Sequence, residues 1–125
     1  MPKAQYSNYI KRAEECLTAA QLAYERAEWN STAINSIHAV IAFADAMSVY
    51  FLGKRHSGEN HNDAANLFKS IKDDEDTSAN ANRIIRVLRM KNMAEYEERL
   101  VNRFEADKML KDAERLAEFV KKKVR

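Results

Sequence analysis

The scarcity of glycine and proline is the feature that most constrains how this chain can fold. Gly53, Gly58 and Pro2 are the only residues of these two types among 125. Strands and hairpins need turn residues at short intervals, so a sheet fold is nearly excluded and we expect an all-α protein. The length suits one hydrophobic core, so we expect a single domain over residues 1–125.

Apolar periodicity and end signals predict the first two helices. Apolar residues recur at steps of three and four over residues 7–28, which indicates one buried stripe on an amphipathic helix. The cluster Asn30-Ser31-Thr32 carries side chains that accept hydrogen bonds from free backbone N–H groups, so a second helix should begin there. It should run to Leu52 and end at Gly53, because glycine most easily takes the left-handed conformation that follows a helix.

The second expected helix is apolar on two sides. Burial on two sides requires either a central position in the bundle or a second subunit. Because small residues let helices approach closely, we favour the second subunit and expect a homodimer through this helix. The main stripe consists of Ile37, Val40, Ile41, Ala44 and Phe51, and the small residues opposite it are Ala39, Ala42 and Ala46.

Two of the polar residues in this helix lie on the flank of its main stripe. His38 and Asp45 lie seven positions apart, which is about 10 Å along a helix, so they cannot touch one another. We expect both to be hydrogen-bonded polar groups in the interior or at an interface rather than catalytic residues.

The second half of the chain should form further helices. A polar loop over residues 54–62 precedes a third helix that begins at Asn62 or Asp63 and buries Ala64, Leu67, Phe68 and Ile71. A charged loop follows over 73–78, with Thr77 or Ser78 as the cap of the next helix. One helix from there to the end would be about 70 Å long, against a radius of gyration of about 14 Å for a compact domain. We therefore expect a helix over 79–91, an irregular or short helical passage, and a last helix that ends near Val124.

The positions of the basic residues are more informative than their number, because the net charge of +2 is too small to require a nucleic-acid partner. The cations over 121–125 complement the carbonyl end of a final helix. Arg83, Arg86 and Arg89 recur at steps of three, which predicts either a solvated face or a basic edge that binds phosphate. We favour the solvated face.

One polar loop carries the residue types that RNA cleavage needs. Arg55 could hold a phosphate and His61 could exchange a proton, with His56 as a further binding residue. The alternative is a solvated loop that is rich in polar residues by chance. A metal site at His56, His61 and Asp63 is a third, disfavoured alternative, and we expect neither metal nor cofactor.

No segment predicts a membrane or a secreted location. Polar residues interrupt the apolar middle of the chain, so no continuous run approaches the roughly 20 apolar residues of a membrane span. No apolar stretch follows Lys3, which argues against a secretory signal. The single Cys16 cannot form an internal disulfide, in agreement with a reducing compartment. We expect a cytoplasmic protein.

Several segments together resemble one protein family. They are Tyr9-x-x-Arg12-Ala13-x-x-x-Leu17-x-x-Ala20, the alanine-rich second helix, Gly58-x-x-His61 before Leu67-Phe68, Arg86-x-x-Arg89-x-x-x-x-Ala94-Glu95-Tyr96, and a closing helix over 106–120. This series is similar to the higher eukaryotes and prokaryotes nucleotide-binding (HEPN) domain. The resemblance implies an antiparallel up-and-down bundle of four to five helices that is often dimeric.

The resemblance also implies two functions. Some members are metal-independent RNases that use an Arg followed by a polar residue and, several positions later, a His. Others bind nucleotides or pair with a small nucleotidyltransferase in toxin–antitoxin systems. In the RNases the motif usually lies later in the bundle, where this chain has Arg89 and no histidine up to Tyr96.

Three hypotheses result from these patterns. The first is a dimeric nucleotide- or RNA-associated module, with a separately encoded nucleotidyltransferase as a partner and with His56, Arg83, Arg86, Arg89 and Tyr96 as binding residues. The second is an RNase that uses Arg55 and His61. The third is a structural dimerisation bundle without catalysis.

Overall fold

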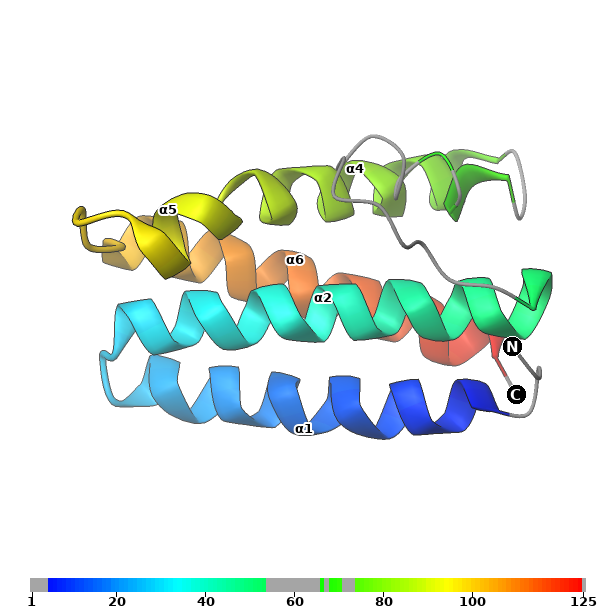
Figure 1. Ribbon diagram of the computed structural model, residues 1–125, viewed down its shortest axis with the longest axis horizontal. Coiled ribbons are helices and arrows are strands. Elements are labelled where there is room, and N and C mark those ends of the chain that lie inside the picture. The colour runs from blue at the N-terminus through cyan, green and yellow to red at the C-terminus, as the bar shows by residue number, and fades with distance from the viewer. Residues whose placement is uncertain (1–4, 54–65, 67, 71–73, 125) are drawn as a thin grey trace.

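The chain forms a bundle of helices. The computed structural model describes residues 5–53, 66, 68–70 and 74–124. Its four long helices are α1 (Tyr6–Glu25), α2 (Trp29–Leu52), α4 (Glu75–Arg89) and α6 (Arg103–Lys123), and the short helix α5 (Lys91–Tyr96) lies between the last two (Figure 1). Successive long helices run in opposite directions, and the described residues contain no strand. The predicted all-α, up-and-down bundle is confirmed.

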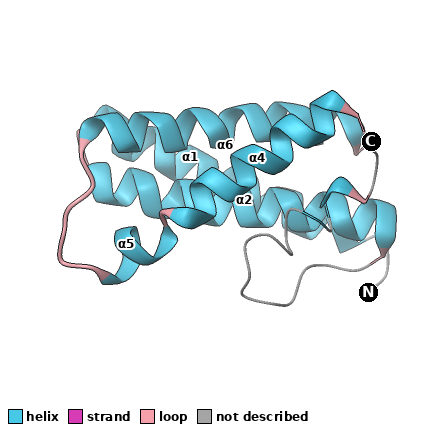
Figure 2. Cartoon of the chain, turned by 90° about the horizontal axis from the view of Figure 1, so that it is seen from above, coloured by secondary structure: helices cyan, strands magenta, loops and turns pink. Residues whose placement is uncertain are grey.

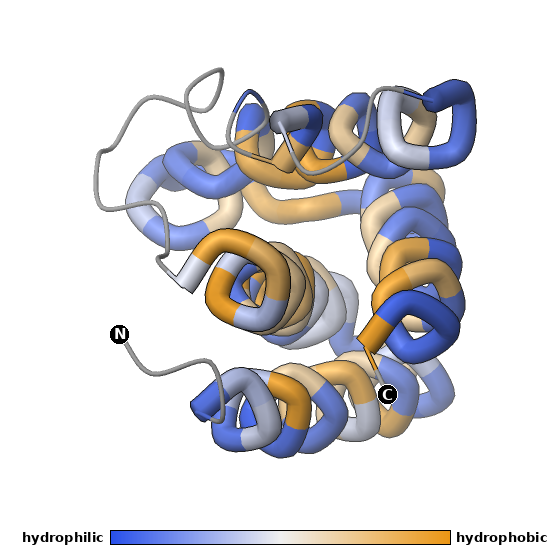
Figure 3. The backbone as a smooth tube through the Cα atoms, turned by 90° about the vertical axis from the view of Figure 1, so that its right-hand side faces the viewer, coloured by the Kyte–Doolittle hydropathy of each residue, from blue (hydrophilic) through white to orange (hydrophobic). Residues whose placement is uncertain are grey.

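Helix α2 occupies the centre of the bundle. It packs against α1, α4, α5 and α6, and Figure 3 shows it between α1 and α4. Ala39, Ala42 and Ala46 are all buried within the single chain. The central position therefore accounts for apolar residues on two sides, without a second subunit, and the homodimer stays a prediction.

The exposed side of α2 differs from the predicted stripe. Ile37 and Val40 are fully buried, but Ile41 and Ala44 are half-buried and 44% of Phe51 is exposed. The prediction was wrong for Phe51 and right only in part for Ile41 and Ala44, which pack against the core without being fully covered. The buried face of α2 also includes Phe43, Met47 and Val49, which the predicted stripe omitted.

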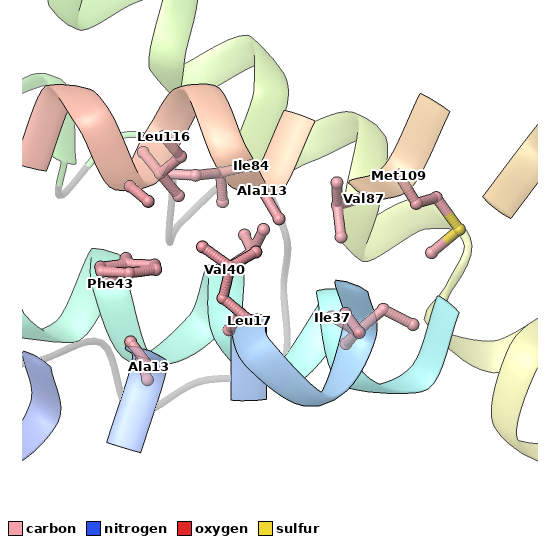
Figure 4. Close-up of a cluster of buried hydrophobic side chains, with 14 of the residues drawn as sticks. Ala13, Leu17, Ile37, Val40, Phe43, Ile84, Val87, Met109, Ala113 and Leu116 are labelled. Carbon is pink, nitrogen blue, oxygen red and sulfur yellow. The ribbon is translucent and has the colours of Figure 1, made fainter. Parts of the chain in front are cut away.

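The core joins all four long helices. Ala13 and Leu17 of α1 meet residues of α2, α4 and α6 in one continuous cluster (Figure 4). Phe68, from the segment predicted as the third helix, is fully buried, and its ring lies 6.0 Å from that of Phe119. The other residues that figure in that prediction, Ala64, Leu67 and Ile71, lie outside the described residues. The cluster residues of α2, α4 and α6 labelled in Figure 4 are Ile37, Val40, Phe43, Ile84, Val87, Met109, Ala113 and Leu116.

The structure corrects the predicted start of α2 and confirms its end. Helix α2 begins at Trp29 and its N-cap Glu28 makes no side-chain capping bond, so the Asn30-Ser31-Thr32 cluster lies in the first turn, where the hydroxyl of Thr32 donates to the carbonyl of Glu28 at 2.9 Å. Helix α2 ends at Leu52, and Gly53 takes the left-handed conformation with φ 69°, as predicted.

Helix α1 ends three residues before the predicted end. Ala27 there has φ 58°, and the N–H of Glu28 donates to the carbonyl of Ala23 at 2.9 Å, which closes the helix end as a glycine would. Alanine gives no sequence signal for this conformation.

The start of α4 corrects a second prediction. Asp74, and not Thr77 or Ser78, caps the helix: its carboxylate accepts the backbone N–H of Thr77 at 2.8 Å. Aspartate is as good a cap as serine or threonine, and Asp74 comes a turn earlier in the chain. The helix therefore begins at Glu75 rather than at residue 79, and the acidic side chains of Glu75 and Asp76 stabilise its first turn.

The irregular passage that the chain length requires covers residues 97–102. Figure 2 shows this long connection between α5 and α6. The N–H of Val101 donates to the side chain of Asn30 at 2.9 Å, which fastens the connection to the start of α2. Asn102 and Glu105 then form a reciprocal capping box at the start of α6. The last helix ends at Lys123, and its final basic residues complement its carbonyl end as predicted.

By length and composition alone, α2 could cross a membrane. Most of that helix is buried by the other helices, as is typical of the central helix of a bundle. This feature therefore gives little support to a membrane span, and the cytoplasmic location stays a prediction.

Candidate functional site

The predicted site residues fall into three groups in the structure. Arg55, His56 and His61 lie outside the described residues, and so does Asp63 of the alternative metal site. Arg83 and Arg86 lie on α4 and are engaged by other side chains. Arg89 and Tyr96 lie at the ends of α4 and α5 and are exposed.

Two of the three arginines on α4 serve the fold. The guanidinium of Arg86 donates two hydrogen bonds to Asp112 of α6, at 3.2 Å from Nε and 2.9 Å from Nη2. This hydrogen-bonded carboxylate raises the pKa of Arg86. Arg83 is half-buried and donates from Nη1 to Asn80 at 2.9 Å. Arg86 thus fastens α4 to α6, whereas Arg83 is held within α4 by this one bond and its buried Nε has no hydrogen-bond partner among the described residues.

Arg89 differs from the other two arginines. It is the last residue of α4, it is exposed, and among the described residues nothing forms a hydrogen bond or ion pair with it. Tyr96 is the last residue of α5 and is also exposed. Of the predicted binding residues that the structure describes, these two are available to a ligand.

A histidine and a carboxylate meet where α5 packs on α2. Nε2 of His38 lies 3.6 Å from Oε1 of Glu95. The side chain of His38 is 52% exposed and that of Glu95 only 13%. Oε1 of Glu95 is buried and has no hydrogen-bond partner in the described part of the chain, because 3.6 Å is too long for a hydrogen bond.

This arrangement is suited to proton transfer at an exposed imidazole. A carboxylate beside one ring nitrogen of a histidine favours a proton on that nitrogen, and the other nitrogen can then accept a proton. Such pairs often shorten only when a ligand is bound. The pair therefore forms a candidate acid–base site between α2 and α5.

We expected His38 and Asp45 to be polar groups in the interior or at an interface, and the structure places only Asp45 in the interior of the chain. Asp45 is buried, as expected for an interior polar group, but His38 lies on the surface of the chain. Glu95 was not predicted as a site residue. Its only signal in the sequence is its place in the segment after Arg89, where the RNase members of the resembled family carry a histidine.

In the described residues no cluster of three or more His, Cys, Asp or Glu side chains could hold a metal ion. His38 and Glu95 by themselves supply too few ligands for a stable zinc site. These two side chains offer proton transfer and hydrogen bonding, and Tyr96, the residue after Glu95, offers an exposed ring for stacking.

The family model described as HEPN domain matches residues 6–123, which is nearly the whole chain. A search of curated proteins gave no match.

Proposed function

From the premise that this chain belongs to the HEPN family, we propose that it binds single-stranded RNA or a nucleotide at the surface around α5. Family membership makes it a nucleotide- or RNA-associated module. One observation carries the proposed place of binding: the exposed His38 and the buried, unpaired Glu95 oxygen meet where α5 packs on α2.

The residues at the two ends of α5 support this proposal. Arg89 precedes α5 and offers an exposed guanidinium to a phosphate. Tyr96 ends α5 and offers an exposed ring on which a base can stack. A cation, a ring and an imidazole are the groups that single-stranded RNA recognition uses.

Fluorescence anisotropy with a labelled single-stranded RNA of mixed sequence, and with labelled ATP, tests the proposal. We expect Arg89→Ala combined with Tyr96→Ala to weaken binding of at least one probe by about tenfold or more, because stacking alone contributes about 1–3 kcal/mol per base. Arg115→Ala is the matched control, since Arg115 is an exposed arginine on α6. Failure of the unmodified protein to bind either probe, or equal affinity in all variants, would contradict the proposal.

RNA cleavage is a second candidate function. The His38–Glu95 contact supports it, because an exposed imidazole beside a carboxylate can accept and donate a proton. The sequence also nominates Arg55 and His61. Incubation of RNA with the protein in EDTA, beside an Arg55→Ala, His61→Ala double variant, tests whether the metal-independent activity exists and whether it needs that loop.

Dimerisation and a nucleotidyltransferase partner also belong to the proposed function. The part of α2 that the other helices leave open, with Ile41, Ala44 and Phe51, supports a subunit contact on this helix. Light scattering should then give twice the 14.4 kDa of the chain, and Phe51→Asp should lower the mass toward one chain. Binding to a small nucleotidyltransferase is tested by co-purification. A dimer that binds neither RNA nor nucleotide would favour the purely structural bundle instead.

A further inference from the structure

Leu100 and Phe104 are large apolar side chains that the fold leaves in solvent. They are 71% and 70% exposed, and among the described large apolar residues only Tyr96 is more exposed. Tyr96 has a place in the proposed binding of RNA or nucleotide, whereas Leu100 and Phe104 have none. Both lie at the end of the bundle that carries the connection between α5 and α6 (Figure 2). We call these two residues the end surface.

The turn that carries Leu100 is fixed by the contacts around it. The guanidinium of Arg99 donates two hydrogen bonds to Glu105, at 3.1 and 2.8 Å. Val101 comes directly before the capping residue Asn102 and is buried, as expected for the hydrophobic staple of a capped helix start. Its two neighbours, Leu100 and Asn102, are exposed. An ordered turn therefore holds the side chain of Leu100 outward.

Phe104 is held beside the same turn. It is the second residue of α6, and the capping box of Asn102 and Glu105 fixes the start of that helix. The ammonium of Lys108, one turn later, lies 5.3 Å from the centre of the Phe104 ring. Apolar side chains that are exposed together and held in place mark an interaction surface.

The charged residues on the two sides of Leu100 have opposite signs. Glu97 and Glu98 come before it in the chain, and Arg103 and Lys108 come after it. All four are exposed, and none of them forms an ion pair with a described residue. The other charged side chains over residues 99–107 are paired within the chain: Arg99 with Glu105, and Asp107 with Lys111.

This pattern favours a second copy of the chain as the partner of the end surface. Two of the four unpaired charges are acidic and two are basic, so the surface has no net charge that would attract a strongly acidic or basic macromolecule. In a contact with two-fold symmetry, each contact between two different residues occurs twice. The acidic side of each copy can then face the basic side of the other copy, and the surface is complementary to itself.

We infer that two copies of the chain associate through their end surfaces, with Leu100 and Phe104 at the centre of the contact. This inference goes beyond the proposed function and does not rest on the binding of RNA or nucleotide. The end surface and Phe51, at the C-terminal end of α2, lie at opposite ends of the bundle (Figure 1). A protein that used both this contact and the proposed contact on α2 would assemble beyond a dimer. Because two apolar side chains form only a small contact, the association is reversible and depends on concentration.

Sedimentation velocity over about a hundredfold range of protein concentration tests the association. The starting protein is Phe51→Asp, which removes the proposed contact on α2, and its mass should rise with concentration from one chain toward two. Adding Leu100→Asp should raise the dissociation constant by about tenfold or more, because a charge replaces a buried apolar contact, and Phe104→Ala should act in the same direction. Leu22→Asp is the matched control: it places the same charge on an exposed leucine of α1 and should change the constant by less than about twofold.

An exchange of charges tests the symmetry of the contact. Glu98→Lys and Arg103→Glu each place like charges opposite one another, so each alone should raise the dissociation constant by about threefold or more at low salt. Both substitutions in the same chain restore opposite charges across the two-fold axis. The doubly substituted chain should therefore associate within about twofold of the starting protein.

Three results would overturn the inference. They are a mass of one chain at every concentration, equal dissociation constants for the Leu100→Asp and Leu22→Asp variants, and no recovery in the charge-exchanged chain. An unchanged mass with weaker RNA binding in Leu100→Asp would assign the end surface to RNA and would overturn it as well. RNA binding by a protein that stays a single chain would leave the proposed binding function standing, whereas association without binding would support the inference and contradict that function.

Discussion

Two pairs in this bundle place a basic side chain of one helix beside a buried carboxylate of another. Arg86 of α4 meets Asp112 of α6, and His38 of α2 meets Glu95 of α5. The two carboxylate side chains are 12% and 13% exposed, and their basic partners 51% and 52%. Yet the first pair is closed by two hydrogen bonds, and the second has a gap of 3.6 Å and an unpaired oxygen.

The difference shows that burial alone does not tell a structural pair from a functional one. A closed guanidinium–carboxylate pair satisfies its buried oxygens and fastens two helices. An open imidazole–carboxylate pair stabilises the fold little and leaves half of the imidazole exposed to a ligand. Variants that add a buried carboxylate, or that remove one from either pair, should therefore change the free energy of unfolding by different amounts.

The largest loss of stability is expected when a substitution introduces a buried carboxylate that has no basic partner. Ala42 is only 4% exposed and lies in the centre of the bundle, so Ala42→Glu should destabilise the protein by about 4 kcal/mol or more through overpacking and an unpaired buried charge. Urea unfolding measures this loss, with Ala42→Ser as the milder control. A variant that keeps the unmodified stability but loses dimerisation would show instead that Ala42 faces a second subunit.

The closed pair should give the next largest effect. Asp112→Ala leaves the half-exposed Arg86 without its two hydrogen bonds, and we expect a loss of about 1–2 kcal/mol, since water compensates part of the interaction. A double-mutant cycle with Arg86→Ala, followed by urea unfolding, isolates the coupling energy. A coupling near zero would mean that the pair does not fasten α4 to α6.

A more exposed carboxylate should give a smaller and pH-dependent effect. Hydrogen bonds from Lys111 and then from the hydroxyl of Tyr24 hold the pKa of Asp107 below its ordinary value of 3.8. Because the folded-state pKa is lowered, this stabilisation is complete above the unfolded pKa and is lost as the pH falls through the folded one. Tyr24→Phe should thus cost about 1 kcal/mol at pH 7 and clearly less at pH 3. Thermal melts at both pH values would contradict this if the two losses were equal.

The open pair should give the smallest effect on stability. Glu95→Gln removes a buried charge that has no hydrogen bond at Oε1, so we expect the free energy of unfolding to change by less than about 0.5 kcal/mol, or to rise. His38→Gln is the companion variant. A loss comparable to that of Asp112→Ala would show that the pair is closed in solution, and the contrast between the two pairs would disappear.

Periodicity predicted much of the fold, because buried stripes and end signals are local in sequence. The end of α2 at Gly53 and the approximate extent of α6 both follow from residues within a turn or two. The left-handed Ala27 and the cap at Asp74 were missed, since alanine carries no signal for a helix end and several residues near Asp74 could serve as the cap.

The candidate site was harder to predict, because it depends on which helix faces meet. Arg86 and Arg89 look alike in the sequence, but only Arg86 faces a carboxylate on α6. His38 and Glu95 are 57 positions apart (95 − 38), and no local pattern shows that α5 folds back onto α2. Pairing across helices is a property of the packed bundle.

Nitrogen-15 NMR of the His38 imidazole tests the central claim most directly, with His38→Ala used to assign its signals. In neutral His38, we predict that the proton resides mainly on Nε2, and that Glu95→Gln shifts the population toward the Nδ1–H form while Asp112→Asn does not. Identical tautomer populations in the unmodified protein and in Glu95→Gln would show that Glu95 does not orient His38. In that case the contact between α2 and α5 would be no acid–base site.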